Sequence, residues 1–162
     1  MAMEVISWLI ALPLLGTVTG LRTFTPLAVL SWFAYSGALQ VQYGWDLWMA
    51  KLPVAIFFTV IAICELIADK QPWMLDRIIL PSVLFKVVLG AFVGAVVADG
   101  LNGPELEGII LGVLSVLVGT YGGYLIRKEL VVRLRYADCN VALVEDAVAV
   151  LCAIFALRVV TG

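Results

Sequence analysis

The sequence contains no histidine, and this absence removes the Ser-His and Cys-His nucleophile pairs together with the commonest ligand of transition metals. Its three cysteines, Cys64, Cys139 and Cys152, show no paired spacing, so neither a disulfide framework nor a CxxC metal site is predicted. We expect no catalytic residues and no cofactor. An enzyme ranks last among the functional classes, because it would depend on carboxylates, Lys86 or Cys64 without an identifiable nucleophile-base pair.

Charged residues are also scarce. They make up 14% of the 162 residues, against roughly 25% in soluble domains, while hydrophobic residues reach 64% and the mean hydropathy is +1.11. Such a chain lacks the polar residues to cover a water-facing surface, so we expect a single integral membrane domain over residues 1–162. The net charge of −2 and the lack of basic residues interleaved with aromatics exclude a nucleic-acid partner.

Apolar runs predict an all-α, polytopic bundle with about five spans, because about 20 apolar residues cross the hydrocarbon core. The run at 26–39 is shorter and suits a re-entrant or interfacial helix. It follows GLRTFTP at 20–26, where Gly20 and Pro26 indicate a helix break. Glu4 stands where a secretory signal carries a cation, so we interpret the first run as a retained span, with a cleaved signal peptide as the alternative. The predicted spans are residues 5–20, 53–68, 78–98, 106–126 and 141–160.

Cations near the span ends set the predicted orientation. With five spans, the links after 53–68 and 106–126 share the cytoplasmic side with the N-terminus and hold six cations, against Arg22, Lys51 and Arg158 on the other side. The expected location is the bacterial cytoplasmic membrane, and counting 26–39 as a sixth span reverses the assignment. A short echo between GTVTG at 16–20 and GTYGG at 119–123 fits an inverted repeat, although so short a match also arises by chance.

Small residues recur every four positions in two of the predicted spans. One stripe contains Gly90 and Gly94 in a GxxxG pattern, and the other contains Gly112, Gly119 and Gly123. Residues four apart lie on one helix face, and small faces are the usual packing seams between membrane helices. We interpret these five glycines as helix-packing residues.

Ionisable residues inside apolar runs form the predicted functional site, because they are costly in a membrane. Five share one depth in the five-span arrangement, since the second span ends, and the third and fifth begin, on the same side. In the functional interpretation, the carboxylates bind a hard cation or pass protons, with Lys86 as competitor or gate. In the structural interpretation, they form an ion-pair network near the interface. The five residues are Glu65, Asp69, Lys86, Glu145 and Asp146.

A second candidate site lies in the GLRTFTP segment, which the five-span arrangement puts on the opposite side of the membrane. Arg22, with Thr23 and Thr25, suits contact with an anion or a lipid headgroup. The alternative is that Arg22 caps the broken helix and anchors it at the surface. The sequence leaves both interpretations open.

Three segments carry a resemblance to a known family. GLRTFTP at 20–26, ELIADKQP at 65–72 and VEDAVA at 144–149, in a glycine-rich chain of this length, resemble the small membrane proteins known as domain of unknown function 4126. The similarity covers nearly the whole chain. It implies a multi-span membrane protein and supplies no mechanism.

Two hypotheses for the function follow. The first is a small permease or channel-like protein, homo-oligomeric in the lipid bilayer, whose cluster around Glu65, Lys86 and Glu145 handles a small ion or solute. The second is a non-catalytic scaffold or assembly factor whose glycine faces bind partner helices. The sequence identifies neither a substrate nor a metal.

Overall fold

The computed structural model describes residues 2–39, 41, 47–68, 80–101, 103–133 and 138–161, with the side chains of 2–8, 138 and 139 excepted. Within these ranges the chain forms helices and short connections, with no strand. The predicted all-α class is therefore confirmed. The elements are α1 (Ala2–Leu21), α2 (Phe24–Tyr35), the 3-10 turn η1 (Leu47–Ala50), α3 (Leu52–Ala68), α4 (Leu80–Gly100), α5 (Glu105–Lys128), the π-helical turn η2 (Glu129–Arg133) and α6 (Asp138–Thr161).

The helix boundaries follow local chemistry. Pro53 and Pro81 are the second residues of α3 and α4, and Pro104 immediately precedes α5, positions where a fixed φ favours helix initiation and no intrahelical N–H is lost. Glu105 and Glu107 lie in the first turn of α5 and Arg127 lies in its last turn, which matches the helix macrodipole at both ends.

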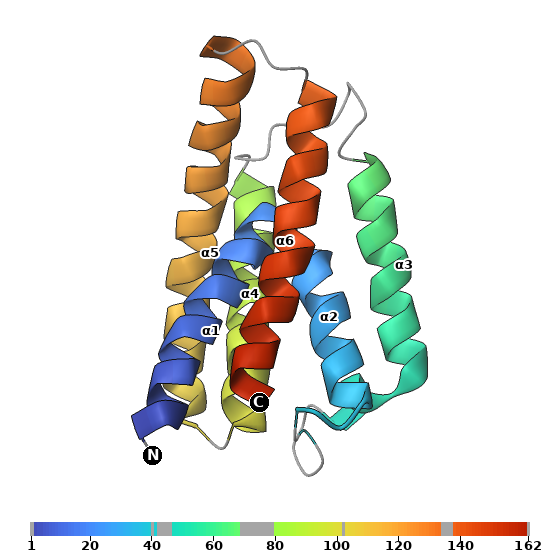
Figure 1. The fold of residues 1–162 in the computed structure, drawn as a ribbon, viewed down its shortest axis with the longest axis vertical. Coiled ribbons are helices and arrows are strands. Elements are labelled where there is room, and N and C mark those ends of the chain that lie inside the picture. Colours follow the sequence, from blue (N-terminus) through green and yellow to red (C-terminus); the bar gives the residue numbers. More distant parts are fainter. Residues whose placement is uncertain are drawn as a thin grey trace.

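Helices α1 and α2 form a hairpin rather than one continuous crossing. In Figure 1, α1 rises from the end of the bundle marked N, and α2 runs back toward that same end. The tip of the hairpin lies inside the bundle, because Leu21 contacts α5 at Gly123, five residues before α5 ends at Lys128. Helix α2 packs mainly against α3 and also against α6. The chain thus reverses direction in the interior.

This reversal changes the predicted arrangement of the ends. The first residues of α1 and the last residues of α6 lie at one end of the bundle, whereas α5 ends with Arg127 and Lys128 at the other (Figure 1). In the five-span arrangement α1 crosses once, whereas in the structure α2 returns to the end at which α1 begins. The prediction that the N-terminus shares a side with this basic link is therefore wrong.

A seam of small residues, here called the glycine seam, joins α1, α4 and α5. Gly90 and Gly94 of α4 approach the backbone of Gly112 and Gly108 of α5 closely. A Cβ added at Gly90 would lie 3.2 Å from the carbonyl oxygen of Gly112, and one added at Gly94 would overlap the carbonyl oxygen of Gly108. Further along the same face of α5, Gly119 lies against the backbone of Thr17 of α1. Missing side chains let these backbones approach, which strengthens dispersion contacts.

The register of the glycine seam also corrects the predicted inverted repeat. Gly16 contacts Gly112, Gly20 contacts Gly119, and Leu21 contacts Gly123, so α1 and α5 run parallel. Helices related by an inverted repeat would run in opposite directions. The inverted-repeat prediction is therefore wrong, and the two similar segments pack beside each other in α1 and α5.

The outer surface of the bundle is apolar along α3 to α6. Two helices in the described part of the chain, Leu80–Gly100 and Glu105–Arg133 counting η2, are long and apolar enough to cross a membrane. Large hydrophobic side chains point outward from all four helices. Examples are Phe57, Val60, Ile67, Leu84, Val88, Leu114, Val118, Leu125, Leu143, Leu151 and Phe155.

Candidate functional site

The break between α1 and α2 is the centre of the polar interior. Arg22 and Thr23 connect the two helices, and both are buried. A helix end leaves N–H groups or carbonyls without intrahelical partners, so two ends meeting inside an apolar bundle require polar partners from elsewhere. Those partners come from α3 to α6.

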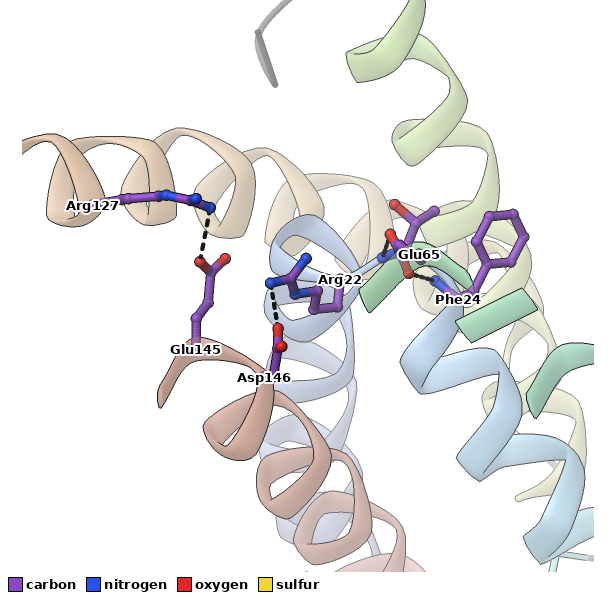
Figure 2. A network of polar contacts seen from close by, with 7 residues as sticks. Arg22, Phe24, Glu65, Arg127, Glu145 and Asp146 are labelled. Carbon is purple, nitrogen blue, oxygen red and sulfur yellow. Dashed lines mark hydrogen bonds and ion pairs between the residues drawn. The ribbon is translucent and has the colours of Figure 1, made fainter. Parts of the chain in front are cut away.

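Glu65 of α3 caps the start of α2. Its Oε1 accepts the N–H of Thr23 at 2.8 Å and its Oε2 accepts the N–H of Phe24 at 2.9 Å (Figure 2). The carboxylate does the work of an N-cap, since the Thr23 side chain makes no capping hydrogen bond. Its negative charge also lies at the positive end of the α2 macrodipole, which stabilises the helix.

Lys86 of α4 serves the other side of the break. Its Nζ donates to the carbonyl oxygen of Gly20 at 2.8 Å, and Thr120 Oγ1 donates to the same oxygen at 3.3 Å. Lys86 is only 7% exposed. A cation at the carbonyl end of α1 complements the macrodipole as Glu65 does at the start of α2.

Arg22 forms an ion pair with Asp146 of α6, as Figure 2 shows. The Arg22 side chain is 1% exposed and Asp146 is 12% exposed, so the pair lies in the interior. Asp146 is eight residues into α6, which begins at Asp138, a depth of roughly 12 Å along the helix axis. A guanidinium as buried as that of Arg22 requires the opposite charge beside it.

Glu145, the neighbour of Asp146, pairs with Arg127 of α5. The distance from Glu145 Oε2 to Arg127 Nη1 is 3.6 Å, longer than a hydrogen bond, and both side chains are partly exposed. Figure 2 shows this pair beside the Arg22–Asp146 pair. Two consecutive residues of α6 therefore contact two different parts of the chain, the α1–α2 break and α5.

Together these residues form a charge cluster, a name used below for Arg22, Glu65, Lys86, Arg127, Glu145 and Asp146. Four of these six residues are among the five for which the sequence predicts a shared depth. Three are cations and three are carboxylates, and they come from the α1–α2 break and from each of α3, α4, α5 and α6. The predicted fifth member, Asp69, lies outside the described residues.

The placement of Arg22 differs from the sequence-based expectation. We expected it on the opposite side of the membrane from the acidic residues, and this is wrong, because the chain turns back at Thr23 and leaves Arg22 beside Asp146. Thr23 and Thr25 are buried next to it. Contact of these three residues with an anion stays a prediction.

Two features of the cluster were not predicted from the sequence. They are the carbonyl oxygen of Gly20 as the acceptor for Lys86, and the hydroxyl of Thr120 on the same oxygen. The break at GLRTFTP was the available signal, because a broken helix exposes carbonyls that need donors. In the part of the chain that the structure describes, no group of three or more Cys, Asp or Glu residues is arranged to hold a metal ion.

The fold and the site define the class as an all-α bundle with an apolar exterior and a charge cluster around an internal helix break. A family model described as domain of unknown function (DUF4126) matches residues 9–160, and the chain belongs to this family. Searches of curated proteins and of solved structures find no match to the chain.

Proposed function

We propose that α3 to α6 each cross a lipid bilayer and that α1 and α2 form a re-entrant hairpin between them. The apolar exterior supports this arrangement, since soluble monomers rarely expose contiguous apolar patches beyond a few hundred Å². Non-helical backbone at membrane depth is tolerated where protein or a wet cavity surrounds it, and the Arg22–Thr23 break is enclosed in this way.

The charge distribution supports an orientation with the basic end in the cytoplasm. Arg127, Lys128 and Arg133 lie at one end of α5 and η2, whereas Glu105 and Glu107 lie at the other. The two chain ends then lie on the non-cytoplasmic side, because both are at the acidic end of the bundle (Figure 1). A reporter fused to either end should therefore be accessible from outside.

We further propose that the protein is a small permease whose charge cluster moves a cation or a proton. The observation that carries this proposal is the meeting of six ionisable side chains around an interior helix break. Such residues are rare in membrane helices and mark ion or proton pathways by default. Interrupted helices also supply the ion and substrate sites of many transporters.

Glu145 is the proposed entry point for the transported ion. It pairs with Arg127 close to the basic end of α5 and both side chains are partly exposed, so an arriving proton or cation can compete with Arg127 for the carboxylate. Asp146 follows directly and holds Arg22 at the break. Neutralising Glu145 alters the balance of charge beside this second pair, which links ion binding to the position of the hairpin.

The test is flux into proteoliposomes. Purified protein is reconstituted with a pH-sensitive dye inside, a potential is imposed with valinomycin and a K⁺ gradient, and proton entry is followed; Na⁺, Mg²⁺ and Mn²⁺ uptake are measured in parallel. We expect flux above that of protein-free vesicles. We expect Glu145→Gln to reduce the flux at least roughly tenfold, as expected when one essential ionisable group is lost.

The matched control is Glu107→Gln, which makes the same change on an exposed residue in the first turn of α5, at the end of that helix far from Arg127. Its flux should equal that of the unaltered protein. Flux no greater than in empty vesicles for every ion tested, or equal flux in Glu145→Gln, would remove the permease proposal.

The scaffold hypothesis, in which glycine faces bind partner helices, stays a second prediction. The contacts of Gly90, Gly94, Gly112 and Gly119 with other helices of the same chain favour the permease over it. We retain the permease as the proposal that the geometry supports best.

A further inference from the structure

Thr25, in the first turn of α2, is 4% exposed, and its hydroxyl makes no hydrogen bond with the described part of the chain. Other helical hydroxyls are satisfied within their own helix. Those of Thr19, Ser31 and Thr59 each donate to the carbonyl oxygen four residues earlier, at 2.7–2.8 Å. For Thr25 that carbonyl belongs to Leu21, on the other side of the break. The break therefore removes the partner that a continuous helix would supply.

This hydroxyl lies next to the charge cluster. Glu65 accepts the N–H groups of Thr23 and Phe24, the two residues just before Thr25. Each Cα–Cβ bond of a helix tilts toward the N-terminus, so the Thr25 side chain points back toward the break. A buried polar group without a partner is costly, and such a group in a native protein indicates a bound water molecule or ion. The orphaned hydroxyl thus indicates a small ligand at the break.

The oxygens around the break favour a water molecule over a metal ion as this ligand. Hard cations take about six or more oxygen ligands. Here the carbonyl oxygen of Gly20 already accepts from Lys86 and Thr120, and both oxygens of Glu65 already accept N–H groups. The charge cluster also contains equal numbers of cations and carboxylates, so it has no excess negative charge to attract a divalent ion. A water molecule needs only about two to four partners, and the Thr25 hydroxyl can both donate and accept.

We propose that Thr25 binds a water molecule at the break and that the ion which the charge cluster moves is a proton. The water oxygen receives a proton and forms a new O–H bond, while one of its other O–H bonds breaks and that proton passes to the carboxylate of Glu65. The numbers of protons and charges balance in this step, and no electron is transferred. This inference rests on the permease proposed above and narrows its substrate to the proton.

The first test is the direction in which Thr25→Val shifts the midpoint of thermal unfolding in detergent. Valine has nearly the shape of threonine and lacks the hydroxyl. Removing a hydroxyl that binds water lowers the midpoint, whereas removing a hydroxyl that has no partner raises it. Thr19→Val is the matched control, because the buried Thr19 hydroxyl is bonded within α1. We expect a lower midpoint in Thr25→Val than in Thr19→Val, and a midpoint at or above that of the unaltered protein overturns the water site.

The second test is proton flux into proteoliposomes. We expect Thr25→Val to reduce it at least roughly tenfold, the loss of one group in a proton-transfer path, and Thr25→Ser, which keeps a hydroxyl, to retain most of it. Thr19→Val should keep full flux. Full proton flux in Thr25→Val, or uptake of Na⁺, Mg²⁺ or Mn²⁺ by the unaltered protein, overturns this inference and leaves the permease standing. Absence of flux for every ion removes the permease, and with it the proton as substrate, while the unfolding midpoint still decides the water site.

Discussion

The glycine seam and the charge cluster both attach α1 to the rest of the bundle, but by opposite chemistry. In the glycine seam, backbones of α1, α4 and α5 touch because side chains are missing. In the charge cluster, long side chains reach from α3, α4 and α6 to the end of α1 and the start of α2. The first contact type tolerates no added atom, and the second tolerates no missing partner.

This difference shows how the hairpin is specified. The glycine seam fixes α1 against α5 without regard to where α1 ends. The charge cluster acts only at the end, where Glu65 and Lys86 satisfy the N–H groups and the carbonyl that a continuous helix would satisfy itself. The direction of α2 therefore depends on residues distant in sequence.

The largest expected effect comes from breaking the innermost ion pair. Asp146→Ala leaves the Arg22 guanidinium, 1% exposed, without its carboxylate. We expect a loss of about 3–5 kcal/mol in the free energy of unfolding, the cost of breaking a buried ion pair by removing one partner. The measurement is unfolding in mixed micelles followed by circular dichroism. An unchanged midpoint would show that Arg22 does not depend on Asp146.

The cap on α2 should be the next largest contribution. In Glu65→Gln, an amide replaces the carboxylate, so one of the N–H groups of Thr23 and Phe24 loses its acceptor and the charge on the helix end disappears. We expect about 1.5–3 kcal/mol of destabilisation. Faster hydrogen exchange at Thr23 and Phe24 is the local readout. Glu105→Gln, on the exposed first turn of α5, should cost less than about 1 kcal/mol.

The glycine seam should respond to an added methyl group. Gly94→Ala puts a Cβ in overlap with the carbonyl oxygen of Gly108, so the helices must separate, and we expect a loss of about 1–3 kcal/mol in the free energy of unfolding. Gly122→Ala is the matched control, since nothing lies within 4 Å of its Cβ position. Helix propensity then predicts a gain of about 0.5–1 kcal/mol. The same sign for both variants in thermal unfolding would contradict the assignment of the seam.

The smallest effect is expected at the exposed pair of η2. Arg133 and Glu129 form an i,i+4 ion pair with both side chains in solvent. Arg133→Gln should cost about 0.3–0.5 kcal/mol, and 1 M salt should remove the difference because exposed pairs are screened. A larger and salt-independent effect would assign this pair to the folded core.

The sequence predicted the helices better than their directions. Long apolar runs located α3 to α6, and the spacing of Glu65, Lys86 and the Glu145–Asp146 pair along those runs predicted a shared depth. Hydrophobic periodicity indicates that a helix forms, but it carries no information about where the chain turns next. The sequence therefore predicts that the first run crosses the membrane and that Arg22 lies away from the acidic residues, whereas the structure pairs Arg22 with Asp146.

The glycines show a related gap. Their spacing predicted small faces in α4 and α5, and the structure puts these faces against each other and against α1. The spacing does not determine whether a small face packs inside the chain or against a partner. That choice depends on shape complementarity between helices, which emerges only when all three backbones are positioned.

The proposed permease requires that the charge cluster moves ions and does more than hold the helix break. The double variant Arg22→Met/Asp146→Leu tests it most directly, because replacing a buried ion pair with apolar residues of similar size often preserves or raises stability. We predict unfolding free energy equal to or above that of the unaltered protein, with loss of flux in proteoliposomes. Full flux in this stable variant would contradict the claim and make the Arg22–Asp146 pair purely structural.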